Sequence, residues 1–226
     1  TRRYEEIIYG PRSYDSYLWE KEKKILDREV SLLHGTTYLD FACGTGRIIG
    51  YLEDRVQSPV GVDNSPEMLE VAKKTVRRSK LIEADLPRDD KLAGCTFGLI
   101  TAFRFFLNAE PILRNEALEV IHNKLAGNGV FIFNIHGNTW SFRAMMTLWC
   151  RFGKRRRLRH ISYWKMKDLL TRHGFTIERL YGTGLVPKPL YRVLPKFVFQ
   201  IVDGAFARLP FSGYFSYNLI FVCKKR

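Results

Sequence analysis

Short apolar runs alternate with amphipathic stretches over most of the chain. The apolar runs predict strands at residues 37–42, 59–64, 80–85, 96–103, 129–137, 176–182 and 218–225. Apolar residues at helical spacing predict one or two helices in the first thirty residues and further helices at 47–56, 66–76, 110–126 and 166–174. Ser65 and Pro66 form a good start for the helix at 66–76. Gly127 and Gly129 are expected to end the helix at 110–126.

This alternation is typical of an α/β fold. Helices that separate consecutive strands favour a doubly wound, mostly parallel sheet of seven strands with helices on both faces. The runs VFIFNI and LIFVC are apolar at nearly every position, as in strands that are buried on both sides. A chain of 226 residues can bury one full core, so we expect a single domain over residues 1–226.

Cysteine usage and hydropathy narrow the class of protein. The cysteines (Cys43, Cys95, Cys150 and Cys223) are scattered, and neither a CxxC pair nor a histidine at metal-ligand spacing accompanies them. No stretch reaches the roughly 18 apolar residues that a membrane-spanning helix needs. No signal-peptide pattern opens the chain. These features predict a reduced, metal-free protein of the cytoplasm.

The stretch LDFACGTGR, residues 39–47, joins a strand directly to a helix through small residues. A glycine turn at the carboxyl end of a strand lets a ligand approach the backbone closely. The turn has neither the GxGxxG spacing of dinucleotide sites nor the lysine of a phosphate-binding loop, which favours a nucleoside without phosphates. Asp63, at the end of the next strand, is placed to bind both ribose hydroxyls. Asp85, after the third strand, is placed to accept the adenine amine.

Four motifs resemble, in order and spacing, those of class I S-adenosylmethionine-dependent methyltransferases. They are LDFACGTGR, GVDNSPEML, IEADL and FGLITAFRFF, and the resemblance covers residues 36–180 and extends to the last strand. Ala42 stands where the family's first motif usually has its first glycine. The resemblance implies a Rossmann-like fold, S-adenosyl-L-methionine as the cofactor, and transfer of its methyl group to an acceptor.

The resemblance also implies which residues meet each part of the cofactor. The glycine turn would pack against the methionine portion, Asp63 would hold the ribose, and residues 101–103 would face the sulfonium. Tyr14 and Tyr17 resemble aromatic residues that fold over the cofactor, and Tyr17 is the preferred candidate. Asp63 can alternatively cap a helix, and Met68 can equally belong to the core. The implied cofactor-binding set is Tyr17, Asp40, Ala42, Cys43, Gly44, Gly46, Asp63, Asn64, Met68, Ala84, Asp85, Leu86, Thr101, Ala102 and Phe103.

Two residues are candidates for catalysis. His136, at the end of the fifth strand, is placed to act as the general base for a hydroxyl acceptor. Bonding to nearby loop backbone is the alternative role for His136. Arg104, just past the fourth strand, is placed to bind an acidic group of the substrate or to pair with Glu110.

Two segments, residues 138–160 and 184–214, go beyond a minimal methyltransferase. The resemblance implies that they form a substrate cap, with residues 1–35 as a helical lid and residues 36–137 as the cofactor-binding core. Both segments are rich in aromatic and aliphatic residues. A basic run, Lys154 to Arg159, follows the aromatic part of the first segment.

The formal net charge of +14 favours an anionic partner. For the basic and aromatic segments, three interpretations stay open: RNA binding, contact with an anionic membrane, or a solvated charged face over an apolar core. Their apolar content favours O- or N-methylation of a small-molecule, sugar or lipid-carried acceptor, with peripheral membrane contact as a less favoured variant. An RNA methyltransferase and an inactive nucleoside-binding scaffold are the alternatives.

Overall fold

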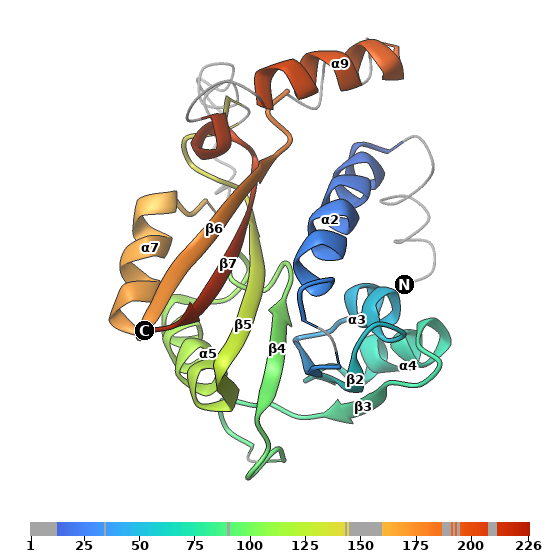
Figure 1. The fold of residues 1–226 in the computed structure, drawn as a ribbon, viewed down its shortest axis with the longest axis vertical. Coiled ribbons are helices and arrows are strands. Elements are labelled where there is room, and N and C mark those ends of the chain that lie inside the picture. The colour runs from blue at the N-terminus through green and yellow to red at the C-terminus, as the bar shows by residue number, and fades with distance from the viewer. Residues whose placement is uncertain are drawn as a thin grey trace.

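The computed structural model shows a seven-stranded sheet between two layers of helices (Figure 1). It describes residues 13–33, 35–89, 91–142, 144, 160–186, 191, 193, 195–207 and 212–226. The strand order is β3-β2-β1-β4-β5-β7-β6. Strand β7 runs antiparallel to both of its neighbours, and the other pairs are parallel. The prediction of a doubly wound, mostly parallel sheet of seven strands is confirmed.

The strands and the helices up to β6 follow one another as the sequence pattern predicts, and α9 and η1 are additional helices in the part of the chain after β6. The strands are β1 (Thr37–Phe41), β2 (Gln57–Asp63), β3 (Lys80–Glu83), β4 (Phe97–Ala102), β5 (Leu125–His136), β6 (Phe175–Thr183) and β7 (Asn218–Lys225). The helices are α2 (Tyr14–Val30), α3 (Arg47–Leu52), α4 (Pro66–Thr75), α5 (Pro111–Lys124), α7 (Tyr163–Arg172), α9 (Lys196–Ala207) and the short 3-10 helix η1 (Ser212–Phe215). Helix α5 ends before the glycines that were expected to end it, because the backbone of Leu125 is already extended (ψ 133°).

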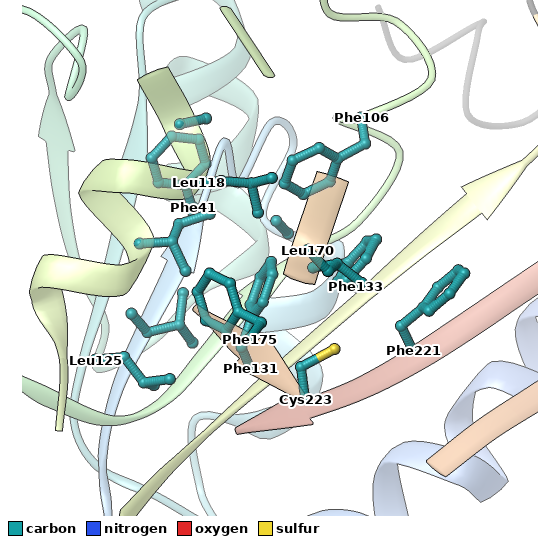
Figure 2. Packing of buried hydrophobic residues seen from close by; sticks show 14 of the residues in the cluster. Phe41, Phe106, Leu118, Leu125, Phe131, Phe133, Leu170, Phe175, Phe221 and Cys223 are labelled. Atoms are coloured by element: carbon teal, nitrogen blue, oxygen red, sulfur yellow. The ribbon is translucent and has the colours of Figure 1, made fainter. Parts of the chain in front are cut away.

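Alternating strand residues supply a hydrophobic core on each face of the sheet. In β4, Ile100 belongs to the cluster with residues of α5 and α7, whereas Leu99 belongs to the cluster with residues of α2, α3 and α4. The first cluster is strongly aromatic (Figure 2). The rings of Phe133 and Phe221, on adjacent strands, stack with their centroids 4.9 Å apart. Because helices cover both faces, the central strands are apolar at nearly every position.

The order of the strands creates a switch point beside β1. The chain proceeds from β1 to β2 and β3 on one side and then forms β4 on the other side of β1. In open α/β sheets, ligands bind in the crevice beyond the carboxyl ends of the strands at such a point. The ends of β1, β2 and β4 therefore define where to look for a site.

Helix α9 lies past the upper end of the sheet in Figure 1 and packs against α2 through a third hydrophobic cluster. The rings of Tyr17 and Phe199 meet edge to face with their centroids 5.1 Å apart. The Tyr17 hydroxyl donates a hydrogen bond to the buried carboxylate of Asp203. Most of the segment 138–160, including the basic run Lys154 to Arg159, lies outside the described residues.

A buried carboxylate just after α3 fixes the chain that leads into β3. Glu53 is fully buried, and it accepts hydrogen bonds from the backbone N–H groups of Arg77, Arg78 and Ser79. The Ser79 hydroxyl donates a further bond to Glu53 at 2.7 Å. Burial alone raises the pKa of Glu53, but these hydrogen bonds outweigh it and hold that pKa below its ordinary value. The anionic form is therefore part of the fold.

Replacing Glu53 with Gln is expected to lower the free energy of unfolding by about 2 kcal/mol or more, because an amide NH₂ then faces backbone donors. Denaturation in urea measures the change. The matched control is Glu70→Gln at an exposed position of α4, which should cost less than about 0.5 kcal/mol. If Glu53→Gln lowers the free energy of unfolding no more than the control does, the Glu53 carboxylate does not stabilise the chain that leads into β3.

Candidate active site

A cavity of about 550 Å³ opens beyond the carboxyl ends of β1, β2 and β4. Its volume is within the range of small-molecule and cofactor sites, about 300–1,000 Å³. One side of its wall comes from the turn after β1 and from the ends of β2 and β3, and the other side comes from the segment after β4. The lining residues are Asp40, Phe41, Ala42, Cys43, Gly44, Thr45, Arg47, Ile48, Val62, Asp63, Asn64, Ser65, Met68, Ala84, Asp85, Leu86, Pro87, Phe103, Arg104, Phe105, Asn108, Ala109 and Leu113.

The turn between β1 and α3 is built from left-handed backbone. The φ angles are 56° at Ala42, 54° at Gly44 and 78° at Gly46. Left-handed backbone costs a residue with a Cβ about 1–2 kcal/mol, so Ala42 fits this turn with some strain. A Cβ at Gly44 would meet no described atom within 4 Å, which leaves this backbone open towards the cavity. A Cβ at Gly46 would lie 3.1 Å from that of Ala72, so Gly46 instead lets α3 approach α4.

Asp63 ends β2 and ties this strand to the glycine turn. Its Oδ2 accepts a hydrogen bond from the N–H of Gly44 at 2.8 Å, and its Oδ1 accepts one from the N–H of Ser65 at 2.9 Å. The helix cap that the sequence offered as an alternative role for Asp63 is provided by Ser65, whose hydroxyl accepts the N–H of Met68. Each carboxylate oxygen has a further lone pair, so Asp63 can also accept bonds from hydroxyls of a ligand in the cavity.

The loops after β2 and β3 complete this side of the cavity. Met68 lines the cavity and is 37% exposed, so it is not a core residue. Ala84 and Leu86 are buried apolar residues on either side of Asp85. The carboxylate of Asp85 lies 3.6 Å from the guanidinium of Arg88. This side thus offers carboxylates for polar contacts and apolar side chains for a flat ring.

Asp40 is a buried acid beneath the turn. Its Oδ1 accepts a hydrogen bond from the Thr101 hydroxyl at 2.6 Å, and its Oδ2 accepts one from the N–H of Ile49 at 3.2 Å. Burial raises the pKa of Asp40 to about 7, even though both bonds and the charge of Arg47 favour the anion. The charge of Asp63 adds to the increase. Asp40 therefore changes charge near neutral pH.

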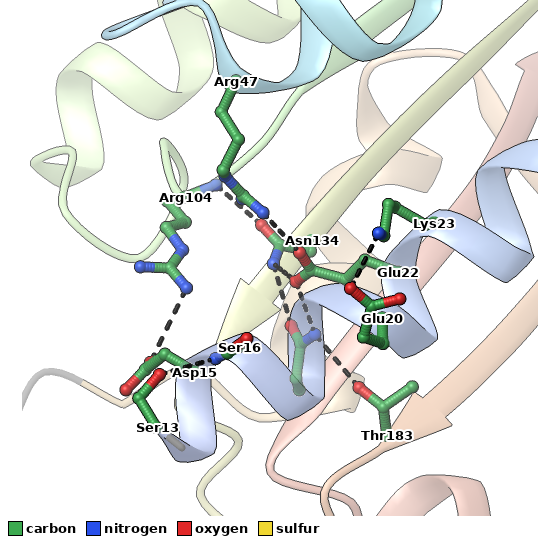
Figure 3. A network of polar contacts seen from close by, with 11 residues as sticks. Ser13, Asp15, Ser16, Glu20, Glu22, Lys23, Arg47, Arg104, Asn134 and Thr183 are labelled. Carbon is green, nitrogen blue, oxygen red and sulfur yellow. Dashed lines mark hydrogen bonds and ion pairs between the residues drawn. The ribbon is translucent and has the colours of Figure 1, made fainter. Parts of the chain in front are cut away.

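Helix α2 brings a second buried acid, Glu22, to the edge of the cavity (Figure 3). Its Oε2 forms an ion pair with Nη1 of Arg47 at 3.0 Å. Its Oε1 accepts hydrogen bonds from the side-chain amides of Asn134 at 3.2 Å and Asn218 at 2.9 Å. Arg47 lines the cavity, and its guanidinium lies 4.2 Å from the ring centroid of Trp19. Glu22 thus joins α2 to the cavity wall and to the sheet.

Arg104 follows β4 with left-handed backbone, at φ 61°. Its N–H donates a hydrogen bond to Oδ1 of Asn134 at 2.6 Å, and its carbonyl accepts one from Nδ2 of Asn108 at 2.8 Å. Its guanidinium lies 3.7 Å from the carboxylate of Asp15 on α2 (Figure 3). Arg104 and Asn108 both line the cavity. A cationic group therefore lies on the β4 side, away from the carboxylates that end β2 and β3.

Some of the predicted site residues are not among the described residues that line the cavity. They are Tyr17, Gly46, Thr101, Ala102 and His136. Thr101 and Ala102 are fully buried in β4, and Thr101 acts on the site only through its bond to Asp40. Tyr17 donates its bond to Asp203 in the cluster between α2 and α9, because α2 turns this side chain towards α9. His136 ends β5, two strands from β1.

Sequence reasoning missed the network around Glu22. Glu22 lies four residues from both Leu18 and Leu26, on the buried stripe of α2. Asn134 interrupts the apolar run of β5. A polar group within an apolar stripe is the sequence signal for a buried polar contact, because such groups are rarely buried without partners. Phe105, which lines the cavity, carries no comparable signal in a region where aromatic residues abound.

Comparison with solved structures identifies the class of fold. A methyltransferase from Thermotoga maritima, described as S-adenosylmethionine-dependent and a possible histamine N-methyltransferase, aligns with a TM-score of 0.66 and 16% identity, over 100% of this chain and 94% of that one. Magnesium protoporphyrin IX methyltransferase from Synechocystis PCC 6803 with bound SAH aligns with a TM-score of 0.65 and 14% identity, over 97% of this chain and 91% of that one. The fold is that of the S-adenosylmethionine-dependent methyltransferases.

Sequence comparison agrees with the fold. The family model of the methyltransferase domain matches residues 39–129, which contain the glycine turn, Asp63, Asp85 and Arg104. An uncharacterised protein of Methanocaldococcus jannaschii is 26% identical over 212 residues, which are 82% of this chain and 80% of that protein. Residues 39–129 therefore match a methyltransferase domain within the fold of the S-adenosylmethionine-dependent methyltransferases, as the motifs indicated.

The raised pKa of Asp40 predicts how stability depends on pH. Because burial favours the neutral acid in the folded state, its contribution to stability is complete below the ordinary pKa of 3.8 and is lost as pH rises through about 7. Relative to Asp40→Asn, the wild-type chain should lose about 2 kcal/mol or more of unfolding free energy between pH 5 and pH 8. Urea denaturation at both pH values measures this difference.

The control for this titration is Asp54→Asn, at an exposed carboxylate just after α3. Its difference from the wild-type chain should stay constant over the same pH interval. A constant difference for Asp40→Asn as well would show that Asp40 is already ionised at pH 5, contrary to the prediction.

Proposed function

We propose that this methyltransferase transfers the methyl group of S-adenosyl-L-methionine to an oxygen or nitrogen of a small-molecule, sugar or lipid-carried acceptor. The observation that carries the proposal is the division of the cavity. Carboxylates and the open glycine turn line the side formed by β1, β2 and β3, and Arg104 and Asn108 line the side next to β4. One side suits a nucleoside and the other suits a second reactant.

The residues on the first side fit the cofactor. Asp63 has lone pairs for both ribose hydroxyls, and Met68 and Leu86 supply apolar surface for the adenine. Asp85 is placed to accept the adenine amine. Gly44 leaves open space where the methionine portion would lie, since a Cβ there would touch no described atom within 4 Å. The bound cofactor supplies an activated methyl group on a sulfonium.

The second side fits an acceptor that carries an acidic group. Arg104 brings a guanidinium to the cavity, and Asn134 holds its backbone in the left-handed region through a hydrogen bond. A guanidinium binds a carboxylate or phosphate with two charge-assisted hydrogen bonds. Methyl transfer needs an acceptor atom held in line with the sulfonium, and such a contact orients the acceptor.

Two further points concern the acceptor. The structurally similar proteins from Thermotoga maritima, described as a possible histamine N-methyltransferase, and Synechocystis, a magnesium protoporphyrin IX methyltransferase, are named for small acceptors, of which histamine carries no acidic group. The general base proposed from sequence, His136, gains no support from the cavity, because it is not among the described lining residues. A nucleophile that is already deprotonated, such as a carboxylate or a neutral amine, needs no base before the transfer.

The cofactor half is tested with Asp63→Asn. This variant should bind S-adenosylhomocysteine about 10- to 100-fold more weakly by calorimetry, because a charge-assisted contact with the ribose is lost. Glu70→Gln, at an exposed glutamate of α4, is the control and should bind like the wild-type chain. Thermal unfolding of both variants verifies that they are folded. Unchanged affinity in folded Asp63→Asn would overturn the proposed ribose contact.

The acceptor half is tested with pairs of candidate acceptors that differ only in whether they carry a carboxylate or phosphate. Turnover is measured as the S-adenosylhomocysteine formed from S-adenosylmethionine. The wild-type enzyme should prefer the acidic member of a pair. Arg104→Gln should raise KM for that acceptor about ten-fold or more while cofactor affinity stays the same. An equal preference in enzyme and variant would remove Arg104 from acceptor binding. No turnover with any acceptor would favour the nucleoside-binding scaffold.

A further inference from the structure

Helix α9 presents a row of apolar side chains to solvent. Phe197 and Ile201 on the helix are 65% and 66% exposed, and Val193, just before it, is 81% exposed. Phe197 and Ile201 are four residues apart, which places them on one face of α9, and Val193 lies before the helix, on the other side of Pro195. Large apolar side chains gathered in this way mark an interaction surface more often than single exposed ones do. We call Val193, Phe197 and Ile201 the outer row.

The opposite face of α9 is fixed against the rest of the protein. Phe199 is fully buried among the tyrosines of the third hydrophobic cluster, which lies between α2 and α9. The carboxylate of Asp203 accepts a hydrogen bond from the Tyr17 hydroxyl, and its Oδ1 accepts bonds from the N–H groups of Leu185 and Val186 at 3.1 and 3.3 Å. These contacts determine how α9 is rotated, so the outer row cannot turn inward without breaking them.

The sequence around α9 is basic. The stretch from residue 187 to residue 211 contains one acidic residue, Asp203, and four basic residues, which are Lys188, Arg192, Lys196 and Arg208. Asp203, the one acid in this stretch of the sequence, is buried and hydrogen-bonded. An apolar row within a basic segment has the composition of a helix that lies in the interface of an anionic membrane.

The 3-10 helix η1, which contacts α9, and the segment after β5 also carry exposed aromatic residues. Trp140 and Phe142, after β5, and Phe215, in η1, are exposed or nearly so. The rings of Phe142 and Phe215 stack with their centroids 5.8 Å apart, and η1 contacts α9. The indole of Trp140, with its apolar rings and one N–H donor, suits the level of the lipid headgroups, and Phe142 and Phe215 add apolar surface.

We propose that the outer row of α9 docks on an anionic lipid bilayer and holds the enzyme at the membrane surface. No helix in the described part of the chain is long and apolar enough to span a membrane, so the contact is peripheral. A second copy of the chain is a poorer occupant, because each copy carries a net charge of +14 and its basic surfaces would repel. Val193 and Ile201 are aliphatic and cannot stack on the bases of RNA.

The experiment is co-sedimentation with vesicles. The wild-type chain should bind vesicles of phosphatidylcholine with about 30% phosphatidylserine and should lose binding as salt rises to about 1 M, where exposed charges are screened within about 3 Å. Phe197→Ser with Ile201→Ser should weaken vesicle binding about ten-fold or more, because two apolar side chains no longer enter the interface. Calorimetry with S-adenosylhomocysteine and thermal unfolding verify that the double variant is folded.

The matched control is Leu32→Ser with Ile112→Ser, which removes two apolar side chains that are 66% and 72% exposed but lie on other elements. It should bind vesicles like the wild-type chain. The proposal is overturned if the wild-type chain does not bind anionic vesicles, if it binds pure phosphatidylcholine equally well, or if the α9 variant binds like the control. It is also overturned if the wild-type chain is a dimer that the α9 variant dissociates. The vesicle test does not require methyl transfer. Its result therefore stands whether or not the proposed acceptor class is correct.

Discussion

The arrangement of helix α2 on the sheet depends on one buried carboxylate, that of Glu22, whose negative charge must be balanced inside the protein. A charge removed from water is tolerated only where an opposite charge and hydrogen-bond donors surround it. Arg47, Asn134 and Asn218 meet that need, and they come from α3, β5 and β7. Helix α2 can therefore satisfy Glu22 in one place only, across the carboxyl ends of the strands. The cavity wall at Arg47 and the position of α2 follow from the same contact.

Asn134 links this constraint to the chemistry of the site. Its side-chain amide nitrogen donates a hydrogen bond to Glu22, and its side-chain oxygen accepts one from the N–H of Arg104. The backbone of Arg104 is in the left-handed region. Left-handed backbone in a residue with a side chain persists only where its surroundings hold it. The network that positions α2 thus also positions Arg104, the cationic residue on the β4 side of the cavity. A change at Glu22 would reach Arg104 through one intervening side chain.

The fold and the cavity wall at the ends of β1, β2 and β3 were accessible from sequence because they depend on local patterns. Apolar runs at strand length and the glycine turn each determine structure within about ten residues, and Asp63 and Asp85 follow from where their strands end. The role of α2 was not accessible, because Tyr17 and Glu22 are both compatible with a lid over a ligand. Their partners, Asp203 and Asn218, lie more than 180 residues away, and no local pattern encodes such contacts.

Helix α2 makes two different buried polar contacts along its length. Near its start, Tyr17 holds α9 through Asp203, and one turn later Glu22 holds the cavity wall. The far end of α2 packs into the core below the sheet ends through Leu26 and Val30. Helix α9 is therefore attached to α2 and not to β1, β2 or β3. Because the outer face of α9 is remote from those strands, substitutions there should leave the cavity wall at the ends of β1, β2 and β3 undisturbed.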